Sequence, residues 1–286
     1  VGFCNLRCPS CPNTNMANSM LVKNPTGIMS TKIFNDILKK LTNEITINEV
    51  YLYNWGEPLI HNKITKIIEI ARTYNLPTII SSNLNISINL DDLIAAGPAK
   101  IHVSTSGFTQ DIYSVAHCGG DVETVKTNMK KLADAKLSHR SQTILNVLYH
   151  LYNYNLKDAV LMRKFAADLG FNFTPYWAGW GSIEKKLEYL ENKVSRDANE
   201  LRYAYSRMPF TFDEALSVLN GNENDVCPYH ENYIVVDVKG NVQLCCMVYD
   251  STKFTVGNIF EDTILDLQYK IKNHQLCPKC KRYGKK

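Results

Sequence analysis

The chain has 286 residues, of which 45% are hydrophobic, so it can bury the core of one large domain or of one large and one small domain. Its formal net charge is +4 and its basic residues are scattered among acidic ones, which excludes a nucleic-acid-binding surface. The sequence has no leader before Cys4 and no run of about eighteen apolar residues. We therefore expect a cytoplasmic protein with no nucleic-acid and no membrane partner.

Nine cysteines gather mostly near the two ends of the chain, which is typical of a metalloprotein rather than of a small disulfide-bonded secreted protein. The first three, Cys4, Cys8 and Cys11, have the spacing C-x3-C-x2-C on one short loop. Three thiolates on one loop can bind a single iron–sulfur cluster and leave one of its irons open to chemistry. The alternatives are a zinc knuckle that takes a fourth ligand from elsewhere, or chance clustering.

Helical and strand patterns alternate after this loop. We expect helices at 31–43, 64–74, 91–96, 122–135 and 156–169, and strands at 49–55, 78–82, 100–105, 143–149 and 171–176. With a further strand ahead of Cys4, these elements form six βαβ-type units on a parallel sheet. Six units are too few for a closed eightfold barrel, so we predict an α/β fold in which residues 1–180 form a partial (β/α)6 TIM-like barrel.

The pattern changes after residue 180. Residues 181–225 are predicted to be a helical connection, with helices near 183–190 and 197–207. Residues 226–286 are predicted to be a small module with short strands at 233–237 and 242–244, joined by a hairpin turn at Lys239-Gly240-Asn241.

Polar motifs stand where three of the predicted strands end, which is the edge at which parallel sheets form their sites. They are Gly56-Glu57-Pro58, Ser82-Asn83 and the pair Ser104 and Ser106. A glycine lets the backbone approach a ligand closely, and a carboxylate follows it. The alternatives are a turn whose glutamate faces solvent, and serines that only cap helices.

Three further residues are candidates for proton or hydrogen-atom transfer. His102 alternates with Ser104 along one strand, and His150 ends the next strand, so either imidazole is a candidate base. Cys118 is a candidate thiol donor of a hydrogen atom. A hydrogen-bonded core histidine and an ordinary free cysteine are the alternatives.

The C-terminal module carries a second set of cysteines, Cys227, Cys245, Cys246, Cys277 and Cys280, in the pattern C-x12-G-x4-C followed by C-x2-C. Four of them are expected to bind a metal centre, with Cys246 as the spare thiol. Spacing alone leaves a zinc ribbon and an iron–sulfur site equally plausible.

The N-terminal loop resembles the signature of the radical S-adenosylmethionine (radical SAM) superfamily, in which three cysteines bind a 4Fe–4S cluster and SAM chelates the fourth iron. The C-terminal pattern resembles the auxiliary-cluster domain of the twitch or SPASM type. These resemblances imply three cofactors: a SAM-binding 4Fe–4S cluster, SAM, and a second, auxiliary 4Fe–4S cluster held by Cys227, Cys245, Cys277 and Cys280.

The same resemblance implies roles for the strand-end motifs. Gly56-Glu57-Pro58 is similar to the family's Gly-Gly-Glu-type motif, so Gly56 and Glu57 would receive the α-ammonium group of SAM. Ser82-Asn83 stands where the family often has Thr-Asn-Gly. Ser104 and Ser106 stand at the position that contacts the ribose or carboxylate of SAM.

The combination resembles the aminocyclitol dehydrogenase of aminoglycoside biosynthesis. It implies an oxidoreductase that abstracts a hydrogen atom from a small polar substrate, a sugar or aminocyclitol alcohol, and passes an electron to the auxiliary cluster. An external one-electron reductant such as flavodoxin or ferredoxin is the implied protein partner. The rivals are a peptide- or protein-modifying maturase or epimerase, and a non-catalytic zinc or electron-transfer protein.

Overall fold

The computed structural model describes residues 1–13, 27–179, 182–191, 206–211, 214 and 226–283. The chain divides into two compact units. The first comprises Val1–Pro9 with Thr26–Ala178, and the second comprises Ser10–Pro25 with Gly179–Lys286. No helix in the described part of the chain is long and apolar enough to cross a membrane.

The first unit is built on a sheet of five strands in the order β1-β2-β3-β4-β5. The strands are β1 (Val50–Tyr51), β2 (Thr78–Ser82), β3 (Lys100–Thr105), β4 (Ile144–Leu151) and β5 (Asn172–Trp177). All neighbouring pairs are parallel. The C-terminal ends of the strands therefore lie at one edge, where the polar motifs of the sequence stand.

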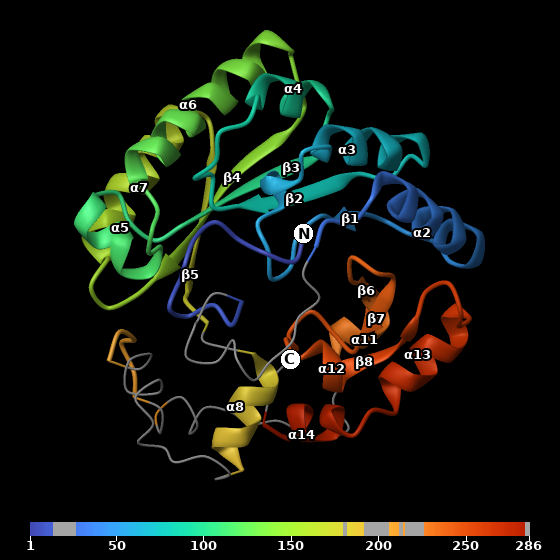
Figure 1. Ribbon diagram of the computed structural model, residues 1–286. Coiled ribbons are helices and arrows are strands. Elements are labelled where there is room, and N and C mark those ends of the chain that lie inside the picture. The colour runs from blue at the N-terminus through green and yellow to red at the C-terminus, as the bar shows by residue number, and fades with distance from the viewer. Residues whose placement is uncertain (14–26, 180–181, 192–205, 212–213, 215–225, 284–286) are drawn as a thin grey trace. The chain divides into compact units, whose positions relative to one another are not determined.

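Helices connect these strands and cover one face of the sheet (Figure 1). They are α2 (Thr31–Glu44), α3 (Ile64–Thr73), α4 (Leu90–Ala95), α5 (Gln110–Ala116), α6 (Val122–Ser138) and α7 (Leu156–Asp168), and a 3-10 turn, η1 (Pro58–Ile60), follows β1. α2 begins where the Ser30 hydroxyl accepts a hydrogen bond from the Ile33 N–H, an N-cap. This arrangement is the α/β class predicted from the alternating patterns.

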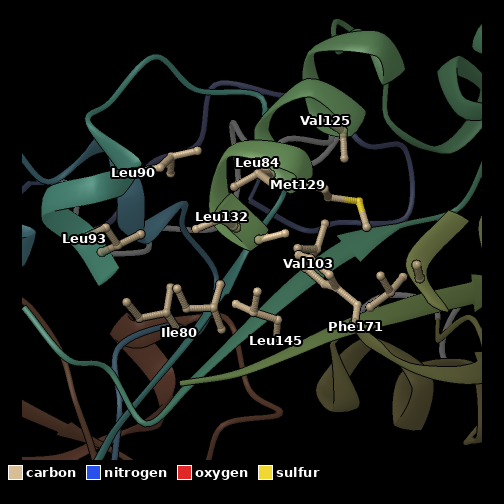
Figure 2. Close-up of a cluster of buried hydrophobic side chains, with 14 of the residues drawn as sticks. Ile80, Leu84, Leu90, Leu93, Val103, Val125, Met129, Leu132, Leu145 and Phe171 are labelled. Atoms are coloured by element: carbon tan, nitrogen blue, oxygen red, sulfur yellow. The ribbon is translucent and has the colours of Figure 1, made fainter. Parts of the chain in front are cut away.

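The core lies between the sheet and these helices (Figure 2). Along β3 the side chains alternate, so Ile101 and Val103 are buried against the helices while His102 and Ser104 point to the other face and are only half-buried. Met129 and Leu132 of α6 are fully buried in the same core. The opposite face is polar at its strand ends because the helices cover one face only.

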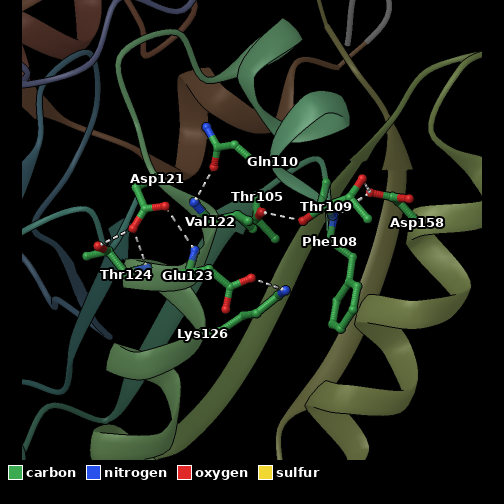
Figure 3. Close-up of polar contacts among 11 residues, drawn as sticks. Thr105, Phe108, Thr109, Gln110, Asp121, Val122, Glu123, Thr124, Lys126 and Asp158 are labelled. Carbon is green, nitrogen blue, oxygen red and sulfur yellow. Dashed lines mark hydrogen bonds and ion pairs between the residues drawn. The ribbon is translucent and has the colours of Figure 1, made fainter.

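Two aspartates fix the loops after β3 (Figure 3). Asp158 of α7 accepts hydrogen bonds from the Phe108 and Thr109 N–H groups, each at 2.7 Å, and from the Thr109 hydroxyl at 2.9 Å. Asp121 caps α6 by accepting from the Thr124 N–H at 2.8 Å. These bonds hold α5 and its flanking loops at the C-terminal edge of the sheet.

The second unit contains a small antiparallel sheet and several short helices. Its strands are β6 (Val235–Val236), β7 (Asn241–Gln243) and β8 (Thr255–Asn258), in that order. Gly240 makes the hairpin turn with φ +88°, and a Cβ atom there would lie 2.7 Å from the Phe260 ring. The helices are α8 (Ile183–Leu190), α11 (Pro228–Asn232), α12 (Ser251–Phe254), α13 (Ile264–Lys272) and α14 (Leu276–Arg282).

The predicted fold class is confirmed, with differences in single elements. Residues 1–13 contain no strand, so the described sheet has five strands rather than six. The sequence patterns also missed α5, β8, α13 and α14, which are short or lack a clear period. The helix predicted near 183–190 is present as α8, whereas that near 197–207 falls almost entirely outside the described residues.

Candidate functional site

The loop that carries Cys4 and Cys8 is attached to the rest of the first unit through its backbone. The Phe3 carbonyl accepts a hydrogen bond from the Glu57 N–H at 2.9 Å, and the Arg7 N–H donates to the Cys118 carbonyl at 2.9 Å. A Cβ atom on Gly56 would lie 2.1 Å from the Val1 carbonyl oxygen, so only glycine fits there. Gly56 thus allows a close backbone approach, and the backbone that approaches it is that of residues 1–3.

Glu57 is buried, with 2% of its surface exposed, and both oxygens of its carboxylate accept hydrogen bonds from within the unit. One oxygen accepts from the Leu59 N–H at 2.9 Å and the other from the Asn83 N–H at 2.8 Å. Burial raises the pKa of Glu57, while these two bonds and one from Ser82 act to lower it. Glu57 thus ties the end of β2 to η1, which begins at the buried Pro58.

Asn83 links the end of β2 to the cysteine loop. Its side-chain amide donates to the Asn5 side-chain oxygen at 3.0 Å and lies 3.6 Å from the Cys4 sulfur. Its own side-chain oxygen accepts from the Asn85 N–H at 2.8 Å. An amide N–H directed at a cysteine sulfur stabilises the thiolate form that binds a metal.

Asn85 and Tyr113 extend this network. The Asn85 side-chain amide donates to the Tyr113 hydroxyl at 2.5 Å, and the Asn5 amide donates to the Asn85 carbonyl at 2.6 Å. Burial raises the pKa of Tyr113, and the negative charges of Cys8 and Cys4 raise it further. Tyr113 therefore remains a neutral hydroxyl within electrostatic reach of both cysteines.

The end of β3 carries a second polar group. The Ser106 hydroxyl lies 2.8 Å from Nδ1 of His117. The His117 ring stacks on Tyr113 with centroids 4.7 Å apart. Burial lowers the pKa of His117 to about 3, so this imidazole is neutral.

His150 ends β4 and adjoins the same group, with its ring centroid 6.3 Å from that of His117. Nε2 of His150 lies 2.5 Å from the Tyr176 hydroxyl. Burial lowers the pKa of His150 to about 4. Of the candidates His102, His150 and Cys118, His150 is the one whose ring adjoins His117 at the strand ends.

The other two candidates have different partners. Nδ1 of His102 lies 3.0 Å from the Asn146 side-chain nitrogen, and the Asn146 oxygen accepts from Thr174 at 3.1 Å. Burial, aided by Lys100, lowers the pKa of His102. The Cys118 thiol donates to the Ser114 carbonyl at 3.2 Å.

The second unit gathers its cysteines in one cavity. Cys227, Cys245, Cys277 and Cys280 all line it, together with apolar side chains and the two lysines Lys186 and Lys281. Cys246 is not among the residues that line it. Cys11 also belongs to the second unit by chain position, whereas Cys4 and Cys8 belong to the first.

The chemistry of this cavity fits an iron–sulfur cluster. Burial raises the pKa of Cys245 to about 12 and that of Cys277 to about 12, so a metal must displace their protons on binding. Four cysteine thiols around one cavity are the donor set of an iron–sulfur cluster, and a structural zinc site uses the same set.

Sequence reasoning missed several residues of the strand-end groups, namely Asn85, Tyr113, His117 and Tyr176. The alternation of Thr174 and Tyr176 along β5 was a usable signal, because it puts Tyr176 on the face opposite the core. Tyr113 and His117 lie on and just after α5, for which the sequence had no clear pattern.

Comparison with known proteins agrees with this description. Residues 227–282 match the SPASM family, an iron–sulfur cluster-binding domain. The chain is 24% identical over 289 residues to a cysteine-type anaerobic sulfatase-maturating enzyme of Clostridium novyi (strain NT), covering 92% of this chain and 76% of that protein.

Two solved structures share the fold. BtrN in complex with AdoMet and 2-DOIA aligns with a TM-score of 0.52 at 17% identity, covering 99% of this chain and 84% of BtrN. SuiB of Streptococcus suis, bound to its precursor peptide SuiA, aligns with a TM-score of 0.59 at 14% identity, covering 99% of this chain and 67% of SuiB. These findings confirm the predicted resemblance to radical SAM enzymes that carry a twitch or SPASM-type domain.

Proposed function

We propose that this chain is a radical SAM oxidoreductase that dehydrogenates an alcohol of a sugar or aminocyclitol and uses its auxiliary cluster as the electron acceptor. The cofactors are those expected from the sequence, and the SPASM match and the AdoMet complex of BtrN support them. When bound, the first cluster and SAM supply a 5′-deoxyadenosyl radical that abstracts a hydrogen atom from the substrate.

The observation that carries this proposal is the four-cysteine cavity. Four protein thiolates close every iron of a cubane, so this centre has no position left for a substrate and is suited to electron transfer. A dehydrogenation needs such a centre, because the substrate radical must lose one electron to become a carbonyl. The neutral polar residues at the strand ends, with the aromatic rings of His150 and Tyr176, suit a hydroxyl-rich molecule.

The residues around the first cluster and SAM have these roles in the proposal. Cys4, Cys8 and Cys11 bind the first cluster, and Asn83 donates a hydrogen bond toward Cys4. The SAM contacts come from Gly56, Glu57, Pro58, Ser82, Asn83, Ser104 and Ser106. In the proposal, Gly56 and Glu57 receive the α-ammonium group of SAM, and each Glu57 oxygen already accepts one backbone hydrogen bond.

Peptide modification is the second candidate, favoured by the likeness to a sulfatase-maturating enzyme and to SuiB with its precursor peptide. Epimerisation would need a thiol donor such as Cys118. A non-catalytic zinc or electron-transfer protein is the remaining alternative. Flavodoxin or ferredoxin is the proposed source of the electron that starts the reaction.

The test is an anaerobic reaction of the iron-loaded protein with dithionite and SAM. It uses a panel of carbon-deuterated aminocyclitols, hexosamines and short cysteine- or serine-containing peptides. Deuterium in 5′-deoxyadenosine together with a ketone from a cyclitol or sugar supports the proposal. Deuterium transferred only from peptides assigns the second candidate, and bound zinc without any SAM cleavage rejects both.

A further inference from the structure

His150 and Tyr176 form a pair at the ends of two neighbouring strands. They are direct partners in the parallel register of β4 and β5. Their rings meet edge to face with centroids 4.7 Å apart, and the Tyr176 hydroxyl lies 2.5 Å from Nε2 of His150. Both side chains lie on the face opposite the core, because Tyr149, one position before His150, and Phe173, three positions before Tyr176, pack on the helical side and strand side chains alternate.

The hydrogen bond of this pair joins the Tyr176 hydroxyl and Nε2 of His150. In the neutral tautomer of His150 that carries its proton on Nδ1, Nε2 is unprotonated and accepts from the Tyr176 hydroxyl. The oxygen of Tyr176 then has lone pairs to accept a further proton.

Exposure decides which of the two a substrate can meet. Tyr176 has 38% of its surface exposed. His150 is less exposed, because His117, Thr105 and Tyr176 surround its ring. Nε2, the free nitrogen of His150, is covered by the Tyr176 hydroxyl. A molecule on this face therefore reaches the base through Tyr176.

We propose that Tyr176 is a catalytic residue of the dehydrogenation, accepting the hydroxyl proton as the substrate radical loses its electron, while its own proton moves to Nε2 of His150. This inference rests on the proposed function. The carbon radical next to the hydroxyl becomes a carbonyl by losing one proton and one electron. The proton ends on His150, and the electron goes to an oxidised iron–sulfur cluster.

The low basicity of His150 is compatible with this step. Removal of an electron from a carbon radical that bears a hydroxyl leaves a protonated carbonyl, which is a strong acid, so a weak base suffices. The neighbouring His117 has its Nδ1 paired with the Ser106 hydroxyl. Tyr53 and Tyr152 are the other ionisable groups that act on Tyr176, and both are neutral phenols at pH 7.

The test compares Tyr176→Phe and His150→Gln with the wild-type protein, using the deuterated aminocyclitol or hexosamine that the wild type oxidises. Both variants should still transfer deuterium into 5′-deoxyadenosine, but the ketone formed per 5′-deoxyadenosine should fall about 100-fold. His150→Gln keeps an acceptor for the Tyr176 hydroxyl but cannot take up the proton. Tyr269→Phe, an exposed tyrosine of α13, is the matched control and should keep the wild-type ratio.

A second measurement does not depend on turnover. In protein labelled with ¹⁵N-histidine, Nε2 of His150 should give the signal of an unprotonated nitrogen, and Tyr176→Phe should shift it while Tyr269→Phe should not. An undiminished ketone ratio in Tyr176→Phe, or a protonated Nε2, overturns the role of the pair and leaves the proposed function standing. If the wild-type protein oxidises no member of the panel, the proposed function itself fails.

Discussion

Cys4 lies among side-chain amides, whereas Cys245 and Cys277 lie in a cavity whose walls include Leu244, Met247 and Leu276. In the first setting, an amide hydrogen is directed at the sulfur. In the second, burial raises the pKa of the thiols to about 12. A polar, partly exposed loop is suited to a cluster that also takes a small ligand. An apolar cavity with four cysteines is suited to a cluster that is closed and exchanges only electrons.

The largest expected effect comes from breaking the N-terminal site. Cys8→Ala should remove about half of the bound iron and abolish SAM cleavage, because two thiolates do not retain a cubane. Iron and sulfide analysis and chromatography of 5′-deoxyadenosine measure both effects. SAM cleavage at the wild-type rate would remove the basis for assigning the first cluster to this loop.

Breaking the C-terminal site should have a different effect. Cys277→Ala should also remove about half of the iron, yet it should keep SAM cleavage and lose the oxidised product. The matched control is Cys246→Ala, which changes a cysteine outside the cavity lining and should keep both clusters and the product. If Cys246→Ala lost as much iron as Cys277→Ala, Cys246 rather than Cys245 would be the ligand of the auxiliary cluster.

Asn83→Ala should sharpen the contrast between the two sites. It removes the donor to Asn5 and Cys4 and the acceptor for the Asn85 N–H, so the free energy of unfolding should fall by about 1–3 kcal/mol. The midpoint potential of the first cluster should also become more negative, because a donor to its sulfur is lost. Denaturant unfolding and potentiometric EPR measure the two effects, and Asn43→Ala, at an exposed position of α2, is the control. An unchanged potential would show that Asn83 only supports the loop.

The smallest effect is expected at Lys281. Its charge favours the thiolate form of Cys277, so Lys281→Gln should shift the midpoint potential of the auxiliary cluster to a more negative value. One partly exposed charge is worth about 1 kcal/mol, or roughly 40 mV for one electron. Potentiometric EPR measures the shift, and Lys272→Gln, at an exposed position of α13, should leave the potential unchanged. A shift in the first cluster instead would contradict the assignment of Lys281 to this cavity.

Much of the fold could be predicted because its signals are local. Alternating helix and strand periods placed α2, α3, α6 and α7 and the strands β2 to β5 close to their observed bounds. The strand ahead of Cys4 was wrong, because residues 1–13 make isolated backbone hydrogen bonds rather than a ladder. The short α5 and β8 were missed because so few residues carry no measurable period.

The sequence by itself determined the two cysteine sets, the order of the strand-end motifs and the alternation that leaves one face of the sheet polar. Only the tertiary structure decided that the Glu57 carboxylate accepts from the Leu59 and Asn83 N–H groups, that Asn83 faces Cys4, and that the Tyr176 hydroxyl lies beside Nε2 of His150. The physical reason is the separation along the chain of the residues that interact. Periodicity and spacing act within a few residues, whereas these contacts join residues as far apart in the chain as Cys4 and Asn83, and they depend on strand register and on which buried groups are already hydrogen-bonded.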